Sequence, residues 1–339
     1  MYIPLRNHTT YSLCKGAIRI NEIISKAKEY EMPAIGIMDS GNLFAALEFS
    51  MACKKNSIQP ILGCEMLVDF TMNDKHTSNL DFENSLRKLP LIATSQEGYE
   101  NLMYLASYAF TSRKPGLSPN TTIDTIAENS SGLIALTGGQ DGPVNKLLKE
   151  NQEVKAEEEL LRLNKMFPNE NLYIELERYE DTMSGKDIEV EKKLISLAQK
   201  HNIPLVATND VYFIDPSMHE AQDILSCIGD GRFHLEKDRK RYSKNQYFKK
   251  IEAIKELFKD IPEAIENTVN IAKKCHVMAN QKEPTLPIFD DSEGFSEKEE
   301  LKKQSHDGLN ERLEIKFKNE EASDGQIEKI KKELGYKMN

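Results

Sequence analysis

Short apolar runs alternate with amphipathic stretches over the first two thirds of the chain. Residues 33–38, 60–68 and 89–93 are apolar runs of strand length. In residues 20–30, by contrast, Ile20, Ile23, Ile24 and Ala27 recur at helical spacing. The alternation continues to residue 207, and it is typical of a mainly parallel sheet whose strands are joined by helices.

The complete pattern predicts one element after another along this region. Predicted strands cover residues 2–6, 33–38, 60–68, 89–93, 132–136, 172–176 and 204–207. Predicted helices cover residues 20–30, 42–55, 99–110, 143–150, 154–166 and 187–201, with Asn42 as an N-cap. Residues 71–83 are predicted to be a loop or the tip of a hairpin. So many strand–helix units favour a closed or nearly closed β/α barrel, and an open doubly wound sheet is the alternative.

The composition changes after Cys275. Residues 281–294 contain Pro284, Pro287 and several acidic residues, which predicts an extended connection. Beyond Ser296 the chain is highly charged and has helical periodicity over residues 299–313 and 326–334. We therefore expect one domain over residues 1–279 and a linker with an incomplete helical segment over residues 280–339.

Charge and cysteine content narrow the function classes. The formal net charge of −10 argues against a protein that grips nucleic acid over its whole surface. The five cysteines are scattered without a CxxC pair, which favours reduced thiols over a disulfide framework. The first ten residues lack the apolar region of a signal peptide, and no apolar run is long enough to span a membrane. We expect a cytoplasmic protein that does not bind membranes.

Polar side chains follow several predicted strands. Arg6 and His8 follow the first strand, Asp39 the second and Glu65 lies late in the third. Asn209 and Asp210 follow the strand that ends near residue 207. Because function gathers at the carboxyl ends of parallel strands, one imidazole and three carboxylates there could bind a divalent metal. Asp and Asn after strands also form turns and cap helices, and the residues alone favour these roles over metal binding.

Longer stretches resemble a known family. LRNHTTYSLCKGAIRI, AKEYEMPAIGIMDSGNLFAALEF and IQPILGCE are similar to the opening of bacterial DNA polymerase III alpha subunits. LIATSQEGYENL, GLIALTGGQDG, IPLVATNDVYFID, YSKNQYF and LFKDIPEAIENTVNIAKKC continue the resemblance in order. Those subunits begin with a PHP domain, named for polymerase and histidinol phosphatase. The resemblance covers nearly all of residues 2–280 and implies a distorted seven-stranded β/α barrel.

The resemblance also implies where a metal centre would lie. Metal-binding PHP domains use nine ligands around a polynuclear centre, and the positions that match here are His8, Asp39, Glu65 and Asp210. The five positions that do not match are occupied by Pro4, Ser40, Lys88, Gly139 and Tyr212. We interpret the four matching residues as a vestigial metal site.

The substitutions favour a site without metal. Lys88 places a cation where the family has a ligand, and it would pair with Asp39, Glu65 or Asp210 in place of the metal. Four ligands are too few for a phosphoesterase, which uses metals to activate water and hold the phosphate. We therefore expect no cofactor in this chain.

Three other features are weaker candidates. His219, on a predicted helix, could replace a lost ligand or simply be solvated. Residues 237–241 and 249–250 are basic and lie near Tyr242 and Tyr247, a combination that binds single strands or forms a solvated face. The glycine-rich residues 137–142 lack a P-loop lysine, so we predict a tight turn there.

The function implied by the resemblance is chromosomal replication. The parent enzyme is a DNA-directed DNA polymerase that uses Mg²⁺, but the aspartate motif of its palm, of the type PDFDxDF, is absent from these 339 residues. The chain alone should not polymerise DNA. The resemblance implies a structural PHP domain that braces the palm and docks the proofreading exonuclease subunit among other replicase subunits, with DNA bound through the full-length protein. An active metal-dependent phosphoesterase or 3′–5′ exonuclease is the alternative.

Overall fold

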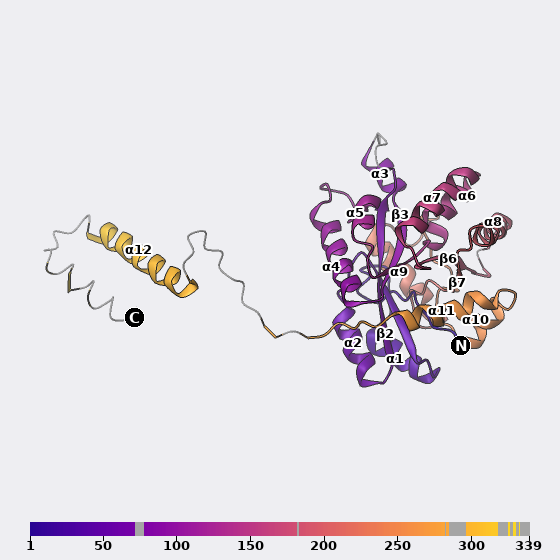
Figure 1. Cartoon of the computed structure of the whole chain (residues 1–339), viewed down its shortest axis with the longest axis horizontal. Coiled ribbons are helices and arrows are strands. Elements are labelled where there is room, and N and C mark those ends of the chain that lie inside the picture. The colour runs from indigo at the N-terminus through magenta and orange to yellow at the C-terminus, as the bar shows by residue number, and fades with distance from the viewer. Residues whose placement is uncertain are drawn as a thin grey trace. The chain divides into compact units, whose positions relative to one another are not determined.

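The chain divides into two compact units, residues 1–281 and residues 282–339. The computed structural model describes residues 1–71, 78–181, 183–281, 283–284 and 296–317, and single positions (325, 328, 329 and 332) beyond them. In the second unit the described element is the helix α12 (Glu297–Phe317). The first unit contains a sheet and the helices that surround it (Figure 1).

Seven strands form one curved sheet in the described part of the first unit. They are β1 (Ala34–Ser40), β2 (Gln59–Asp69), β3 (Arg87–Ala93), β4 (Thr121–Thr122), β5 (Leu133–Leu136), β6 (Leu172–Glu177) and β7 (Leu205–Thr208). Their order is β1-β2-β3-β5-β6-β7, with β4 beside β2. In a doubly wound sheet the strand order runs first one way and then the other along the chain. Apart from β4, the order here runs one way throughout, so the barrel prediction is confirmed.

Most neighbouring strands are parallel, as predicted, but β3 is antiparallel to both β2 and β5. The amino end of β3 therefore lies at the same edge as the carboxyl ends of β1, β2, β5, β6 and β7. We call this edge the barrel mouth.

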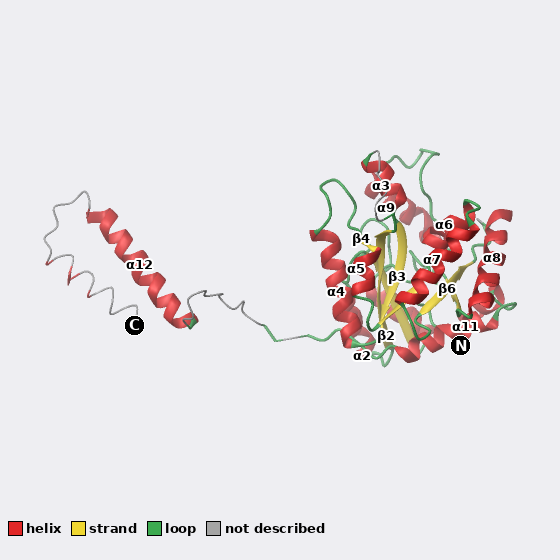
Figure 2. Cartoon of the chain, turned by 45° about the horizontal axis from the view of Figure 1, so that its top comes forward, coloured by secondary structure: helices red, strands yellow, loops and turns green. Residues whose placement is uncertain are grey.

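Helices surround the strands (Figure 2). In chain order they are α1 (Ile20–Glu29), α2 (Ala46–Lys55), α3 (Asn79–Ser85), α4 (Gln96–Thr111), α5 (Ile123–Glu128), α6 (Pro143–Lys149), α7 (Glu153–Met166), α8 (Gly185–His201), α9 (His219–Asp230), α10 (Ile251–Leu257) and α11 (Pro262–Lys274). None of the helices in the described ranges is long and apolar enough to cross a membrane. All five cysteines are free thiols, as expected.

The amino-terminal segment closes the gap between β1 and the chain that follows β7. The amide of Gly36 donates to the carbonyl of Pro4, and the amide of Met38 donates to that of Asn7. On the other side, the amide of Val211 donates to the carbonyl of Arg6. The predicted strand over residues 2–6 is nevertheless wrong, since the segment forms only an isolated bridge at Asn7. Pro4, which has no amide hydrogen, interrupts any regular ladder.

The inside of the barrel changes from apolar to charged along each strand. On β2, Ile61 and Glu65 point to the same side, because side chains alternate along a strand. Ile61 joins a buried apolar cluster with Ile3, Leu5 and Ile271, and residues from α11 complete this apolar floor. The charged residues then gather above the floor, at the mouth.

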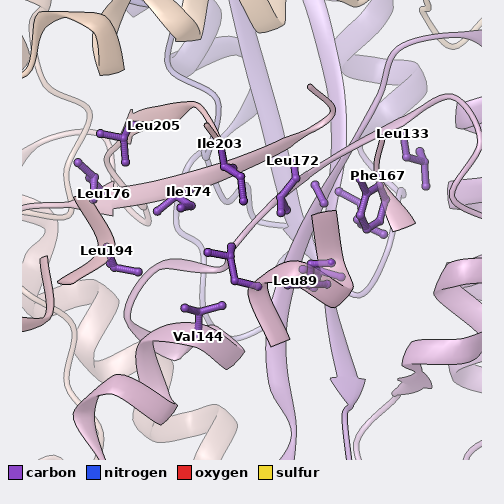
Figure 3. Close-up of a cluster of buried hydrophobic side chains, with 14 of the residues drawn as sticks. Leu89, Leu133, Val144, Phe167, Leu172, Ile174, Leu176, Leu194, Ile203 and Leu205 are labelled. Carbon is purple, nitrogen blue, oxygen red and sulfur yellow. The ribbon is translucent and has the colours of Figure 1, made fainter. Parts of the chain in front are cut away.

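A second apolar layer lies between the strands and the outer helices. Leu172, Ile174 and Leu176 alternate with the inward side chains of β6 and pack outward with residues of neighbouring helices (Figure 3). The helix residues in this layer include Val144 of α6 and Leu194 of α8. Burial on this face makes the β/α alternation visible in the sequence.

Other predicted boundaries need correction. Helix α2 begins at Ala46 with Ala45 as its N-cap, so Asn42 is not the cap. The Asn42 side chain instead donates to the carbonyls of Tyr11 and Ser40 and holds the preceding turn. Of the predicted loop 71–83, residues 79–83 belong to α3, and residues 72–77 lie outside the described residues. Most of the predicted linker (282 and 285–294) and of the helix at 326–334 also lies outside them.

Gly36 tests the closure of the barrel. A Cβ atom at this position would lie 2.6 Å from the carbonyl oxygen of Leu5, which is backbone and cannot move away easily. We expect Gly36→Ala to lower the free energy of unfolding by about 1–3 kcal/mol in urea denaturation. Gly185→Ala is the matched control, since its Cβ would meet nothing within 4 Å. Equal stability of the two variants would contradict this closure.

Candidate functional site

The side chain of Arg6 lies at the centre of the barrel mouth and is 1% exposed. Its Nη1 atom lies 3.1 Å from Glu175 Oε1 and 2.7 Å from Glu177 Oε1. Its Nη2 atom lies 3.0 Å from Asp210 Oδ1 and also donates to Glu65 Oε2. One guanidinium thus binds four buried carboxylates from three different parts of the chain.

The charges at the mouth shift one another's pKa values. Burial would lower the pKa of Arg6, but the carboxylates, led by Asp210 and Glu175, raise it well above its usual range. Burial would raise the pKa of Asp210, but Arg6 holds it far below its usual range. For Glu177, burial dominates and raises the pKa to about 8, and Arg6 offsets only part of this effect. Glu177 therefore holds a proton more readily than Glu65 or Asp210.

Lys88 supplies a second cation. It lies near the amino end of β3, and the antiparallel direction of β3 brings it to the mouth. Its Nζ atom lies 3.2 Å from Glu65 Oε1 and 3.6 Å from Asp141 Oδ2. Burial would raise the pKa of Glu65, but its cationic neighbours, led by Lys88, lower it to about 2. The predicted pairing of Lys88 with a surviving carboxylate is confirmed for Glu65.

Three of the four predicted ligands come together. His8, Glu65 and Asp210 have ligand atoms within 4.8 Å of one another, and all three are buried. His8 Nε2 lies 2.7 Å from Asp210 Oδ1 and 3.8 Å from Glu65 Oε2. The Tyr212 ring stacks on His8 at 4.2 Å between centroids, and its hydroxyl donates to Asp210 Oδ2. Tyr212 thus covers the imidazole where the family has a ligand.

Asp39 is not part of this group. Its Oδ1 atom accepts hydrogen bonds from the amide of Thr9 at 2.7 Å and from Ser12 Oγ at 2.6 Å. Its Oδ2 atom accepts a hydrogen bond from Thr9 Oγ1 at 2.8 Å. Burial raises the pKa of Asp39. This carboxylate fixes the turn that contains Ser12, while His8 Nδ1 lies 3.3 Å from the Ser12 hydroxyl.

The remaining substituted positions also serve the packing. The Ser40 hydroxyl donates to Glu65 Oε1 at 3.3 Å. Gly139 has a φ of +52°, and a Cβ there would overlap the carboxylate of Glu177. A larger ligand side chain would therefore displace Glu177 from Arg6. Pro4 contributes its carbonyl to the closure of the barrel.

A cavity of about 170 Å³ opens above the Arg6 cluster. It is lined by cationic and anionic side chains together, including Lys88, Asp141, Glu177, Asp210, Lys240 and Arg241. Lys240 Nζ lies 3.0 Å from Asp141 Oδ2, so this lysine pairs with an acid of the same wall. The mixed charge gives the cavity no strong preference for either an anion or a cation.

The weaker sequence candidates have structural roles. His219 opens α9, its Nε2 atom lies 3.0 Å from the carbonyl of Tyr242, and it is not a member of the His8–Glu65–Asp210 group. In the basic stretches, Arg239 pairs with Asp223 and Lys249 is buried against Asn209. The glycine-rich residues lead through a short turn at 139–141 into α6, so the predicted turn is confirmed.

Glu175 and Glu177 are the site residues that the sequence reasoning missed. They lie two positions apart on β6, so both point into the barrel, whereas the alternate residues Ile174 and Leu176 point outward. An acidic residue at an inward position needs a cation as a partner. The alternation of acidic and apolar residues in the sequence could have indicated these two buried glutamates. Only the fold shows that their partner is Arg6.

The sequence of this chain matches a known family and known proteins. The PHP domain family matches residues 4–179. A DNA polymerase III subunit alpha from Caulobacter vibrioides is 38% identical over 92% of this chain, and one from Rickettsia bellii is 36% identical over the whole chain. The chain spans only 27–28% of the length of these relatives.

Solved structures are more distant. A putative metal-dependent phosphoesterase from Bifidobacterium adolescentis aligns with 76% of this chain at 11% identity, with a TM-score of 0.40. Such a likeness is too weak to transfer a function.

Replacement of Lys88 tests its role as the counter-charge of Glu65. Lys88→Met leaves a buried carboxylate without one partner, so we expect a loss of about 3 kcal/mol in the free energy of unfolding near pH 7. Lys240→Met is the matched control, because that lysine is more than half exposed and should cost less than about 1 kcal/mol. Urea denaturation of both variants measures the difference.

The contribution of the Glu65–Lys88 pair to the free energy of unfolding depends on pH. Because the pKa of Glu65 is lowered to about 2, the stabilisation is present above the unfolded-state pKa and is lost as the pH falls towards 2. The gap between wild type and Lys88→Met should therefore shrink as the pH falls below about 4. A gap that is constant down to the acid transition would contradict the pairing.

Glu177 should produce the opposite pH dependence. Its pKa is raised to about 8, so its contribution is present below the unfolded-state pKa and is lost as the pH rises towards 8. Relative to Glu177→Gln, the wild type should lose stability between about pH 5 and pH 8, by at most about 1.4 kcal/mol per pH unit. Parallel pH profiles of the two proteins in urea denaturation would contradict the assignment.

Proposed function

Because the chain belongs to the PHP domain family, we propose that it is the N-terminal part of a replicative DNA polymerase and that its barrel is a metal-free structural domain. The observation that carries the proposal is the position of Arg6 and Lys88 among the carboxylates of the mouth. In this proposal the parent enzyme extends a primer with deoxynucleotides, and Mg²⁺ serves the part of the polymerase that lies beyond this chain.

The residues at the mouth do not fit a polynuclear metal centre. A metal ion between His8, Glu65 and Asp210 would have to displace the Arg6 guanidinium, which contacts both carboxylates. The Lys88 ammonium would repel it from the other oxygen of Glu65. Asp39, the fourth candidate ligand, uses both oxygens for Thr9 and Ser12. The two cations thus take the part that metal ions play in active family members.

An active phosphoesterase or 3′–5′ exonuclease is the second candidate. The close approach of His8, Glu65 and Asp210 is the observation that favours it. Such an enzyme uses metal ions to generate the nucleophile and to stabilise the transferred phosphoryl group. Arg6 and Lys88 already contact the carboxylates of Glu65 and Asp210 that would bind such ions, so the scaffold role is the better supported.

The scaffold would act within a replicase. Its proposed partners are the palm of the same polymerase, the proofreading exonuclease subunit and other replicase subunits. DNA would be bound through the full-length protein, and the complex would work in the cytoplasm. The support is the similarity to DNA polymerase III alpha subunits over 92–100% of the chain.

Metal removal tests the scaffold proposal. We expect the purified chain to contain much less than one zinc, manganese or iron ion per molecule, and EDTA to leave its thermal midpoint unchanged. A bound ion present at 100 times its Kd would add about 2.7 kcal/mol to the stability, so added Mn²⁺ would give a clear shift if it bound. Elemental analysis and thermal melts measure both quantities.

A stoichiometric metal would overturn the scaffold proposal. The phosphoesterase candidate further requires Mn²⁺-dependent hydrolysis of a single-stranded oligonucleotide that disappears in Asp210→Asn. Activity that survives this substitution would be a contaminant and would leave the scaffold proposal in place.

Docking of the exonuclease subunit is tested separately. We expect the purified subunit to co-elute with this chain in gel filtration at micromolar concentrations, as transient interfaces of ordinary size allow. Independent elution of the two proteins would refute the docking role and would leave the metal-free state of the mouth unaffected.

A further inference from the structure

A small cavity lies among β6, α6 and α8, three elements that are labelled in Figure 2. Its volume is about 20 Å³, which is enough for one particle of the size of a water molecule. Side chains of all three elements line it, among them Asn145 of α6, Glu175 and Glu177 of β6, and Asp187 of α8. We call it the β6 cavity.

The amide oxygen of Asn145 is the group in this lining that the protein leaves unsatisfied. Asn145 is 7% exposed, and its Oδ1 atom is buried without a hydrogen-bond partner among the described residues. Buried polar atoms of native proteins nearly always have a partner, because the loss of hydration without one costs free energy. An oxygen atom in this position therefore requires a hydrogen-bond donor or a cation beside it.

The two carboxylates that α8 contributes to the lining already have partners. Lys149 Nζ lies 3.1 Å from Asp187 Oδ1, and Asp187 Oδ2 accepts a hydrogen bond from Ser184 Oγ at 2.6 Å. Glu191 accepts hydrogen bonds from the guanidinium of Arg178 on both of its oxygens. The charges of Asp187 and Glu191 are thus balanced one to one, and these groups have little left to offer a ligand.

The two carboxylates of β6 are not balanced in this way. Glu175 and Glu177 both contact the guanidinium of Arg6, which also binds Glu65 and Asp210. One positive charge therefore serves four carboxylates. Burial raises the pKa of Glu177 to about 8, even though Arg6 opposes this effect. The β6 side of the cavity thus carries an excess of negative charge next to the unsatisfied oxygen of Asn145.

The size of the cavity limits which cation it could take. Mg²⁺ requires octahedral coordination and keeps several of its water molecules, and Ca²⁺ takes about six to eight oxygen ligands. A cavity for one particle has no room for those water molecules. Na⁺ and K⁺ are about as large as a water molecule, and K⁺ is bound elsewhere by rings of carbonyl oxygens. A water molecule would satisfy Asn145 but would leave the charge of the β6 carboxylates unchanged.

We propose that the β6 cavity binds one monovalent metal ion, sodium or potassium, through the amide oxygen of Asn145 and the carboxylates of Glu175 and Glu177. The ion links α6 to β6 and shares with Arg6 the negative charge of the β6 carboxylates. The inference goes beyond the proposed function and does not depend on it. The site uses no ligand of the His8–Glu65–Asp210 group, so its presence or absence leaves the question of divalent metal ions at the mouth unchanged.

Thermal melts of the full chain in different chloride salts test the proposal. At about 0.15 M salt and about pH 8.5, where Glu177 is mainly ionised, KCl or NaCl should raise the thermal midpoint by about 2–5 °C relative to choline chloride. Choline is too large for the cavity, so it controls for ionic strength. Asn145→Leu, which keeps the size of the side chain but removes its oxygen, should abolish the difference between the salts. Asn270→Leu is the matched control, because Asn270 is exposed on α11 and should keep the difference.

Diffraction from wild-type crystals grown in rubidium chloride gives a second measurement that needs no variant. Rubidium replaces potassium and scatters anomalously, so we expect one anomalous peak in the β6 cavity, next to Asn145 Oδ1. Ordered density there without an anomalous peak would show a water molecule and would overturn the proposal. Equal midpoints of the wild type in all three salts, or a salt difference that persists in Asn145→Leu, would also overturn it. A larger shift with Mg²⁺ than with K⁺ at equal ionic strength would contradict the choice of a monovalent ion.

Discussion

The contact of the Arg6 guanidinium with four buried carboxylates is the interaction on which the barrel mouth depends. Glu65 comes from β2, Glu175 and Glu177 from β6, and Asp210 from the segment after β7. Four carboxylates that face one another without a cation would repel strongly in such a buried place. Arg6 lies on the segment that closes the barrel, so the charge balance of the mouth and the closure of the sheet depend on the same few residues.

The direction of β3 extends this arrangement. Because β3 is antiparallel to its neighbours, its amino-terminal residues lie at the mouth, and Lys88 reaches Glu65 and Asp141. Two cations still do not balance all the carboxylates nearby, and burial raises the pKa of Glu177. A buried ionic cluster contributes little net stability compared with apolar packing, but the loss of one member leaves the others unpaired. The cluster therefore fixes the shape of the mouth more than it stabilises the fold.

The sequence predicts the repeating part of this structure well. The outward face of each strand packs beneath helices, so the apolar periodicity reveals nearly every strand and most of the helices before residue 208. The periodicity carries no strand direction, and for that reason the reversal of β3 was not predicted. The periodicity also predicted a strand at residues 2–6, which is wrong. This apolar run is a buried irregular segment, because Pro4 breaks the ladder of hydrogen bonds. The resemblance placed His8, Glu65 and Asp210 correctly at one site, but it could not show that Asp39 is engaged by Thr9 and Ser12.

We propose that protein cations replace metal ions at the mouth. Diffraction data from crystals soaked in Mn²⁺, collected where manganese scatters anomalously, would test it most directly. We expect no anomalous peak between His8, Glu65 and Asp210, with the Arg6 side chain still among the carboxylates. A strong peak at that position, with Arg6 turned away from Glu65 and Asp210, would contradict it.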